Sequence, residues 1–400
     1  MPNKISFSTS YAGQAPSFLS SAIAASGLVF VSGSCGVEQG VFVQGDVKDR
    51  ATVALKRIQS LLQARGLGME DVVSSTVYLS KYVQDYDSLN EAYLQAFPQD
   101  IKPTRTCVGA SALPSGTDVE ITCIAVEKSH GPIQKITSPE LPDTLPFLSP
   151  ALSIQDLVFV SGQCAEDGGS SAHTVNDRTK SALGNVRVLL KQAGLGLEDV
   201  ISSTVYLTKY KEDFNMMNQA YIQAFTTGSP FPTRTCIGLE RLPGGTDVEI
   251  TCIAAKRNDG SGQRVRVPIN VPSLGAVPPF LSSNILAPKA KLYYLSGTTG
   301  VGTDGTVSDR TRAALENIKT RLVEVGLGLS DVVSSTIYLS NYVEDFGAMN
   351  KAYTPFFPTD PPSRTCIGIK DLPQGTDVEI TCVAALREPH MGKTTQSAKL

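Results

Sequence analysis

Apolar residues in the first third of the chain switch between strand-like runs and helix-like spacing. A β-rich run that ends in glycine at 27–33 predicts a strand followed by a loop. Apolar residues recur at helical spacing over 47–65, and Gly66 predicts the end of that helix. The pattern then predicts a strand at 72–79, a helix at 83–97 and strands at 105–111 and 119–126. The predicted order is β-α-β-α-β-β, with a strand or hairpin before it.

The same pattern is written three times. The block PTRTC occurs at 103–107 and 232–236, and PSRTC follows at 362–366, so the period is 129 or 130 residues. A second block, LPSGTDVEITC, LPGGTDVEITC and LPQGTDVEITC, begins at 113, 242 and 372. A period of this length is a domain rather than a solenoid unit. We therefore divide the chain into domains at 1–130, 131–262 and 263–390, with a tail at 391–400.

A sheet that carries two helices on one face leaves its other face uncovered. That face is rich in β-branched residues and needs a partner. Three copies can cover one another around a threefold axis, because one head-to-tail interface repeated three times closes a ring. Three domains that did not contact one another would each expose an apolar sheet face to water. We therefore expect a closed arrangement of three domains in one chain.

Composition and charge exclude several functions. The apolar fraction of 41% suffices for a core in each domain. Lys plus Arg total 35 against 38 Asp plus Glu, and no basic stripe is present, so we do not expect nucleic acid as a partner. No apolar run has the length of a membrane span and the N-terminus lacks a signal-peptide pattern, so we expect an intracellular protein with no membrane partner.

Cysteine and histidine positions argue against disulfides and metal. Six of the eight cysteines recur at matching places of the repeat, without a C-x-x-C pair, and are interpreted as reduced thiols. His130, His173 and His390 fall at unrelated places, outside any ligand spacing. No metal site is predicted.

The side chains that could form a binding or catalytic site lie on the last two predicted strands of each repeat. We expect these strands to form a hairpin through the turn Pro-Ser-Gly-Thr at 114–117. Alternation puts Arg105 and Cys107 on one face, and Glu120 opposite its neighbours Val119 and Ile121. The hairpin would bring a guanidinium, a thiol and a carboxylate together in each repeat. Such a group can bind a carboxylate and activate water, or it can be a structural ion pair beside a small buried cysteine, and spacing alone leaves both open.

The recurring strings identify a family resemblance. LVFVSG at 28–33, LNEAY at 89–93, and P-x-R-x-C at 103–107 followed by LPSGTDVEI at 113–121 resemble the RidA/YjgF family across essentially all of each copy. The resemblance implies an α/β (α+β) fold of three tandem RidA/chorismate-mutase-like domains, each a mixed sheet with two helices. It further implies a monomeric pseudo-threefold single-chain trimer with a central β-barrel and three clefts between domains.

The resemblance also implies an activity and a set of site residues. Many members hydrolyse 2-imino or enamine acids to 2-keto acids and ammonia without a cofactor, because an imine is already an activated electrophile. The carboxylate of this small-molecule substrate would be bound by Arg105, Arg234 and Arg364, and water would be positioned by Glu120, Glu249 and Glu379. The remaining implied cleft residues are Cys107, Cys236, Cys366, Gly33, Gly162, Gly297, Asn90, Asn218 and Asn350.

One part of the family pattern is broken in all three copies. The family has a tyrosine that projects into the cleft, and this chain has Leu19, Leu148 and Leu281 there. Loss of the hydroxyl makes the pocket more apolar and favours a bulkier substrate. We therefore expect an imine or enamine deaminase, with a diverged biosynthetic hydrolase or cyclisation enzyme for a larger apolar substrate as the second hypothesis. A non-catalytic ligand-binding or chaperone-like module is the third. An endoribonuclease is disfavoured by the charge and by the lack of a suitably placed histidine.

The chain ends in Ala398, Lys399 and Leu400, a variant of the Ser-Lys-Leu peroxisomal address, on a polar tail. We expect a peroxisomal protein that is bound by the import receptor, with a cytoplasmic location as the alternative.

Overall fold

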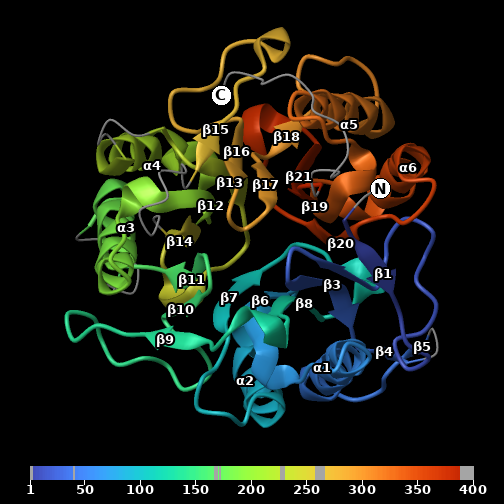
Figure 1. Ribbon diagram of the computed structural model, residues 1–400, viewed down its shortest axis with the longest axis vertical. Coiled ribbons are helices and arrows are strands. Elements are labelled where there is room, and N and C mark those ends of the chain that lie inside the picture. The colour runs from blue at the N-terminus through green and yellow to red at the C-terminus, as the bar shows by residue number, and fades with distance from the viewer. Residues whose placement is uncertain are drawn as a thin grey trace.

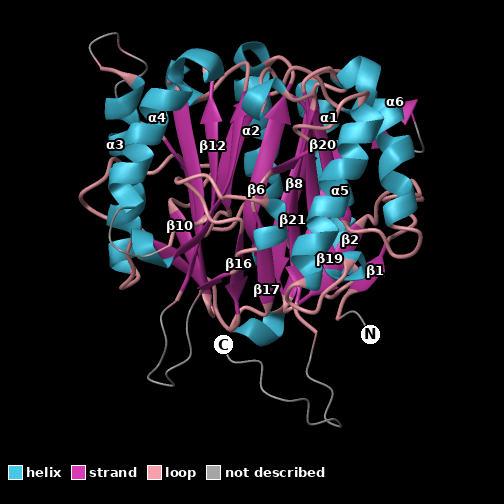
Figure 2. Cartoon of the chain, turned by 90° about the horizontal axis from the view of Figure 1, so that it is seen from above, coloured by secondary structure: helices cyan, strands magenta, loops and turns pink. Residues whose placement is uncertain are grey.

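The computed structural model describes residues 3–38, 41–165, 170, 173–225, 230–256 and 266–387. Within these residues it holds six α-helices and four β-sheets. Three α/β units lie around a common centre, with the helices outside and the strands inside (Figure 1, Figure 2). None of the described helices is long and apolar enough to cross a membrane. The predicted tail and the predicted boundary at 262/263 lie outside the described residues.

The three repeats share one order of elements. The first comprises β1 (Ile5–Phe7), β2 (Ala22–Ala25), β3 (Leu28–Cys35), β4 (Val37–Glu38), β5 (Val41–Phe42), α1 (Val47–Gln63), β6 (Val72–Leu79), α2 (Tyr82–Ala96), β7 (Thr104–Gly109) and β8 (Val119–Val126). The second comprises β9 (Gln134–Ile136), β10 (Ala151–Ile154), β11 (Leu157–Gln163), α3 (Val175–Gln192), β12 (Val200–Leu207), α4 (Tyr210–Phe225), β13 (Thr233–Gly238) and β14 (Val248–Ala255). The third comprises β15 (Val267–Pro268), β16 (Asn284–Ala287), β17 (Leu292–Leu295), β18 (Thr298–Thr299), α5 (Val307–Val323), β19 (Val332–Leu339), α6 (Tyr342–Tyr353), β20 (Ser363–Gly368) and β21 (Val378–Ala385). The predicted element order is therefore confirmed.

The strand order within each sheet differs from the prediction. The first sheet has the order β1-β2-β3-β8-β6-β7, and the main sheets of the second and third repeats have the equivalent order, with β18 added beside β21 in the third. Strands β4 and β5 form the fourth, two-stranded sheet. Strand β6 lies between β7, which it pairs in parallel, and β8, which it pairs antiparallel. The predicted hairpin of 105–111 with 119–126 is therefore wrong. The connection between these strands is long enough to cross the end of β6, and its Ala110 and Leu113 are buried in a cluster shared by all three repeats.

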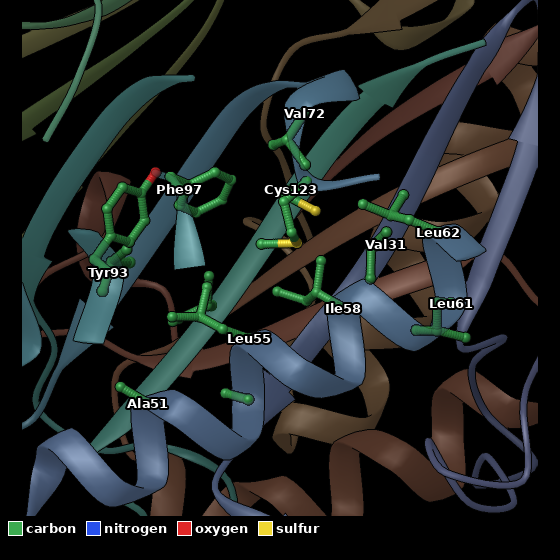
Figure 3. Packing of buried hydrophobic residues seen from close by; sticks show 14 of the residues in the cluster. Val31, Ala51, Leu55, Ile58, Leu61, Leu62, Val72, Tyr93, Phe97 and Cys123 are labelled. Atoms are coloured by element: carbon green, nitrogen blue, oxygen red, sulfur yellow. The ribbon is translucent and has the colours of Figure 1, made fainter. Parts of the chain in front are cut away.

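The two helices of each repeat cover one face of the sheet. In the first repeat, Leu55, Ile58 and Leu62 of α1 pack against Val31 of β3 and Cys123 of β8 (Figure 3). These are the positions that the helical spacing selects, because residues three and four apart share one face.

The eight cysteines are free thiols.

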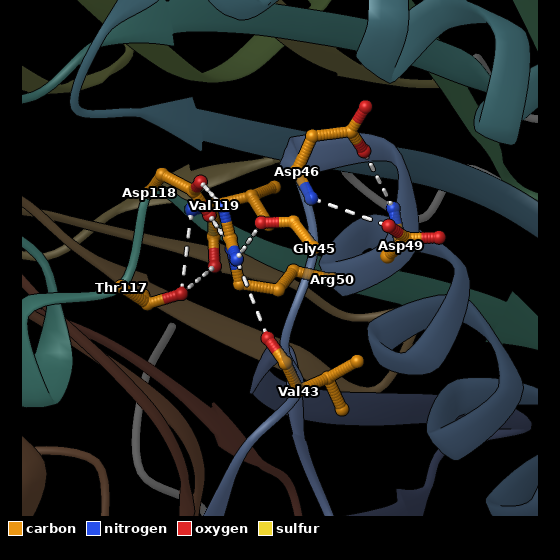
Figure 4. A network of polar contacts seen from close by, with 8 residues as sticks. All are labelled: Val43, Gly45, Asp46, Asp49, Arg50, Thr117, Asp118 and Val119. Atoms are coloured by element: carbon orange, nitrogen blue, oxygen red, sulfur yellow. Dashed lines mark hydrogen bonds and ion pairs between the residues drawn. The ribbon is translucent and has the colours of Figure 1, made fainter.

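An ion pair ties the first helix of each repeat to the start of its central strand. Arg50 donates from Nε to Asp118 Oδ1 at 2.7 Å, and Asp46 and Asp49 cap α1 reciprocally (Figure 4). The same pair recurs as Arg178 with Asp247 and as Arg310 with Asp377. A bidentate guanidinium–carboxylate contact fixes orientation as well as position, so it sets the helix against the sheet.

The opposite face of each sheet is covered by the other two repeats. One cluster unites apolar residues from all three repeats, among them Phe30, Phe159 and Tyr294. A second cluster contains the three equivalent tyrosines Tyr78, Tyr206 and Tyr338. They pack with apolar residues from the end of each β7-type strand and from the segment after it, which are Val108, Ala110, Leu113, Ile237, Leu239, Leu242, Ile367, Ile369 and Leu372. The expected mutual burial of the inner faces is confirmed.

Backbone hydrogen bonds connect the repeats in one direction around the centre. The N–H of Gly109 donates to Arg241 O at 2.9 Å, that of Gly238 to Asp371 O at 2.7 Å, and that of Gly368 to Ala112 O at 2.8 Å. The first repeat thus contacts the second, the second the third, and the third the first.

The cluster that contains Phe30, Phe159 and Tyr294 is shared by the three repeats, so a cavity in it should lower the stability of all three together. Phe159 is 2% exposed, and Phe159→Ala should lower the free energy of unfolding by about 3 to 5 kcal/mol. Denaturant unfolding should show one transition at a lower midpoint. Val343→Ala, at a side chain that is 79% exposed, is the control and should leave the midpoint almost unchanged. Separate transitions for the three repeats would contradict a shared core.

Candidate active site

Three equivalent clefts lie where the β7-type edge strand of one repeat meets the next repeat. We name them the 1/2, 2/3 and 3/1 clefts after the repeats that form them. In each, the backbone N–H of the edge-strand arginine donates to a serine of the following repeat. The pairs are Arg105 with Ser161 at 2.9 Å, Arg234 with Ser296 at 2.9 Å, and Arg364 with Ser32 at 2.8 Å.

Each of these arginines is buried between two aromatic rings. The guanidinium carbon of Arg105 lies 4.5 Å from the ring centre of Tyr93 in its own repeat and 4.8 Å from that of Phe147 in the next. Arg105 Nη1 also donates to Asn90 Oδ1 at 2.6 Å. Stacking fixes the plane of the guanidinium and leaves its edges available for hydrogen bonds. The corresponding residues are Tyr221, Phe280 and Asn218 around Arg234, and Tyr353 and Phe18 around Arg364.

The arginines keep buried donors that no described residue satisfies. These are Nε and Nη2 of Arg105, Nε of Arg234, and Nε and Nη1 of Arg364. In the 3/1 cleft Asn350 Oδ1 also has no partner among the described residues. Arg364 therefore lacks the hydrogen bond to asparagine that Arg105 and Arg234 make in the other two clefts. A buried guanidinium donor without an acceptor is costly. An anionic ligand with planar oxygens would satisfy it.

The carboxylate of each cleft comes from the following repeat. The positive charge of Arg105 lowers the pKa of Glu249. Arg234 has the same effect on Glu379, and Arg364 has it on Glu120. Burial raises the pKa of each of these carboxyl groups to about 8, against a smaller lowering by the facing arginine. One oxygen, Oε2, has no partner in any of the three among the described residues. Each glutamate is therefore mostly protonated at neutral pH.

A glycine makes room for each glutamate. A Cβ atom at Gly33 would lie 1.7 Å from Glu120 Oε1, and Cβ atoms at Gly162 and Gly297 would lie 1.6 Å from the corresponding oxygens of Glu249 and Glu379. No side chain fits such a space, so these glycines are required by the position of the carboxyl group.

The 3/1 cleft contains a cavity of about 280 Å³. Arg364 and Glu120 both line it, together with Cys366, Phe18 and Leu19. Burial raises the pKa of the Cys366 thiol to about 12, so the thiol stays neutral. The cavity therefore offers a cation, a protonated carboxyl group and an apolar wall to a small ligand.

The comparisons with known proteins agree with the three repeats. The family model described as Endoribonuclease L-PSP matches residues 12–127, 140–256 and 282–386. The chain belongs to this family, which is the RidA/YjgF family of the sequence resemblance.

Individual relatives match one repeat, whereas one solved structure matches most of the chain. The mitochondrial protein mmf1 of Schizosaccharomyces pombe is 36% identical over 126 residues, covering 30% of this chain and 75% of that protein. The putative reactive intermediate deaminase TdcF of Escherichia coli is 35% identical over 109 residues, covering 26% and 83%. A chorismatase crystal structure matches 80% of this chain and 94% of its own at 15% identity and a TM-score of 0.54, which shows a shared fold alone.

The family residues do not meet as the spacing predicted. Arg105, Cys107 and Glu120 were predicted to lie together on one hairpin. In the structure Arg105 and Cys107 face the helices, whereas Glu120 lies on the opposite face of the same sheet, with β6 between their strands. Each arginine and cysteine instead meets the glutamate of the next repeat. The groups are Arg105, Cys107 and Glu249; Arg234, Cys236 and Glu379; and Arg364, Cys366 and Glu120.

The aromatic residues that stack on the arginines were not predicted from the sequence. Phe18, Phe147 and Phe280 directly precede the leucines that were singled out, and they stack on the arginine of the preceding repeat. Their recurrence in all three repeats was the available signal. Leu19 lines the 3/1 cavity, Leu148 packs on the core of the first repeat, and Leu281 is half-buried.

The raised carboxyl pKa values predict an unusual dependence of stability on pH. The folded pKa of about 8 exceeds the ordinary value of 4.5, so the folded state holds more protons between these values and its stability falls as pH rises through that window. The triple variant Glu120→Gln, Glu249→Gln, Glu379→Gln should lose this component. Unfolding free energies at pH 5 to 9 would check it, with the exposed Glu91→Gln as control. A stability profile identical to that of the unaltered protein would show that the three groups titrate normally.

Proposed function

We propose that the protein is a hydrolytic deaminase of 2-imino acids and their enamine tautomers, which releases 2-keto acids and ammonia. The observation that carries the proposal is a buried arginine with unsatisfied donors in each cleft, accompanied by a glutamate of the next repeat, as Arg364 and Glu120 show by lining one cavity. The donors match a substrate carboxylate in bidentate geometry. The name of the TdcF relative as a putative reactive intermediate deaminase supports the same reaction class.

The arrangement suggests how the cleft residues act. Arg105 binds the substrate carboxylate and places the adjacent C=N carbon near Glu249. The protonated Glu249 gives its proton to the imine nitrogen while water adds to the carbon, and the resulting carboxylate takes a proton from that water. The neutral tetrahedral adduct then forms the C=O bond as its C–N bond breaks. Glu249 carries the hydroxyl proton to the leaving nitrogen, so imine and water become keto acid and ammonia.

A second candidate is a diverged hydrolase or cyclisation enzyme for a larger apolar substrate. It is favoured by the apolar wall of the 3/1 cavity, where Leu19 stands at the place of the family tyrosine beside Phe18, Leu61 and Phe346. This candidate uses the same arginine and glutamate. Substrates of increasing side-chain length separate the two candidates, because a cavity of about 280 Å³ accommodates only small ligands without rearrangement.

The arrangement of the repeats belongs to the proposal as well. We infer that the chain is a monomeric counterpart of a homotrimer, with the inner strands forming a central β-barrel. Support comes from the directional Gly–carbonyl hydrogen bonds, which return from the third repeat to the first, and from the inner clusters that unite all three sheets. A single-chain ring holds all three clefts at fixed geometry without an assembly equilibrium.

Removal of the three arginines should abolish turnover. The triple variant Arg105→Ala, Arg234→Ala, Arg364→Ala should release ammonia from freshly generated 2-iminobutanoate at least about a hundredfold more slowly, because the carboxylate loses its anchor. Arg312→Ala, at a largely exposed side chain, is the matched control. Circular dichroism would verify the fold. Undiminished turnover in a folded triple variant would exclude these clefts as the site.

We propose a peroxisomal location, with the import receptor as a partner that binds the end of the chain. Ala398, Lys399 and Leu400 lie outside the described residues, so support rests on their sequence alone. Deletion of these three residues from a protein tagged at its N-terminus should move it from peroxisomes to the cytosol, as fluorescence microscopy would show. Conversion of Ala398 to Ser is the control and should preserve import. An unchanged distribution after the deletion would refute the address.

A further inference from the structure

The 3/1 cleft differs from the other two at one helix position. Arg57 is the eleventh residue of α1, and the equivalent positions of α3 and α5 are Asn185 and Asn317. In the second repeat Asn185 Nδ2 donates to Cys164 O at 3.0 Å, next to the strand end that carries Gly162. Arg57 reaches further along the corresponding loop and donates from Nη1 to Val37 O at 2.8 Å.

Arg57 lines the same cavity as the proposed substrate anchor. Arg57, Cys35, Glu120 and Arg364 all border the 280 Å³ cavity. Arg57 lowers and Glu120 raises the pKa of the Cys35 thiol, so both charged groups lie close to Cys35. Arg57 is half-buried, and its buried Nε has no partner among the described residues. The side chain is therefore anchored at one nitrogen, and its charged group lies at the border of the cavity without a carboxylate partner among the described residues.

The charges of this cleft are unbalanced. Its two guanidinium groups face one carboxyl group, Glu120, which is mostly protonated at neutral pH. Burial raises the pKa of the Cys35 thiol well above its ordinary value, so Cys35 adds no negative charge. Glu38 is exposed and accepts a hydrogen bond from Tyr11. A ligand with a single carboxylate would leave one of the two guanidinium charges uncompensated.

The other clefts provide an internal comparison. The 1/2 cleft has Asn185 and Leu189 at the helix positions equivalent to Arg57 and Leu61. The 2/3 cleft has Asn317 and an arginine one turn later, Arg321, whose Nη1 donates to Thr298 Oγ1 at 3.0 Å and whose buried Nε, like that of Arg57, has no partner among the described residues. Arg57 borders the described cavity of the 3/1 cleft, and the 1/2 cleft, with no arginine at either helix position, is the matched comparison.

We propose that the 3/1 cleft takes substrates with two carboxylates, with Arg364 binding the carboxylate next to the imine carbon and Arg57 binding the one at the end of the side chain. The inference rests on the proposed deaminase function for the reaction and adds the substrate class of this cleft. The 1/2 cleft, which lacks the second guanidinium, takes monocarboxylates.

Kinetics of single-cleft variants test the proposal. Glu249→Gln with Glu379→Gln leaves only the 3/1 cleft with its glutamate, and Glu120→Gln with Glu379→Gln leaves only the 1/2 cleft. The measured quantity is the ratio of kcat/KM for the imine of glutamate to that for the imine of 2-aminobutanoate. We expect the ratio to be about 10 to 100 times higher for the 3/1 cleft, the range that one charge-assisted hydrogen bond supplies.

Substitutions at the two equivalent helix positions assign the preference to Arg57. Arg57→Asn should lower the kcat/KM ratio of the 3/1 cleft until it equals the ratio of the 1/2 cleft. Arg57→Lys should retain part of the preference for the imine of glutamate. Asn185→Arg should raise the kcat/KM ratio of the 1/2 cleft. Lys56→Asn removes an exposed charge from the neighbouring position and is the control. Equal ratios in both clefts, or a ratio that Arg57→Asn leaves unchanged, would overturn the proposal.

A binding measurement separates this inference from the proposed function. Calorimetric titration of the intact chain with 2-oxoglutarate and with 2-oxobutanoate needs no turnover. Tighter binding of 2-oxoglutarate that disappears in Arg57→Asn would support the dicarboxylate cleft even if no imine were hydrolysed. Equal binding of the two keto acids would overturn it, even if the protein proved to be a deaminase.

Discussion

The structure depends on the burial of the second face of each sheet. Two helices cover one face, and the opposite face carries residues such as Phe30, Phe159 and Tyr294, which are each at most 4% exposed. A six-stranded sheet with such a face is not stable in water by itself, because burial of apolar area supplies most of the folding free energy. Three faces in one chain cover one another. This requirement fixes the relative orientation of the repeats and, with it, the position of every cleft.

The clefts follow from the same arrangement because strand alternation separates the arginine and the glutamate of each repeat on opposite faces of its sheet. Arg105 projects from its edge strand to the helix side of the sheet, and Glu120 projects from β8 to the inner side. They can act only with partners from the neighbouring repeats. Each cleft therefore needs two repeats, and no repeat contains a complete site. A cleft can therefore change through residues of a single repeat while the arrangement of the three repeats stays the same.

Much of the fold was predictable from local patterns, whereas the pairing of strands was not. The bounds predicted for β6 and β8 match the structure because their ends are marked by strong β-rich runs and turn residues. The hairpin prediction failed because adjacency in sequence was taken for adjacency in the sheet. Periodicity shows which face a residue occupies but not which strand lies beside it. The Pro-Ser-Gly-Thr segment has turn chemistry and nevertheless crosses the end of β6.

The site was predictable as a set of residue types and not as a set of contacts. The repeated blocks selected Arg105, Glu120 and Gly33, and the structure gives each a definite environment, with Gly33 explained by the space that Glu120 occupies. The exchange of partners between repeats was not accessible, because it depends on the closure of three sheets rather than on any one of them. Residues that act across a seam, such as Phe147 and Ser161, carry no local pattern that connects them with Arg105.

The buried charges also limit how the clefts can diverge. A guanidinium that is 3% exposed is tolerated because aromatic rings, an asparagine and a facing carboxyl group surround it. Removing any of these leaves a buried charge or donor uncompensated, at a cost of about 1 to 3 kcal/mol or more. Positions at the rim, such as that of Arg57, are half-buried and lack this constraint. Fusion of the repeats therefore permits each rim to change independently, while the buried Arg and Glu, and the glycine that leaves room for Glu, recur in all three repeats.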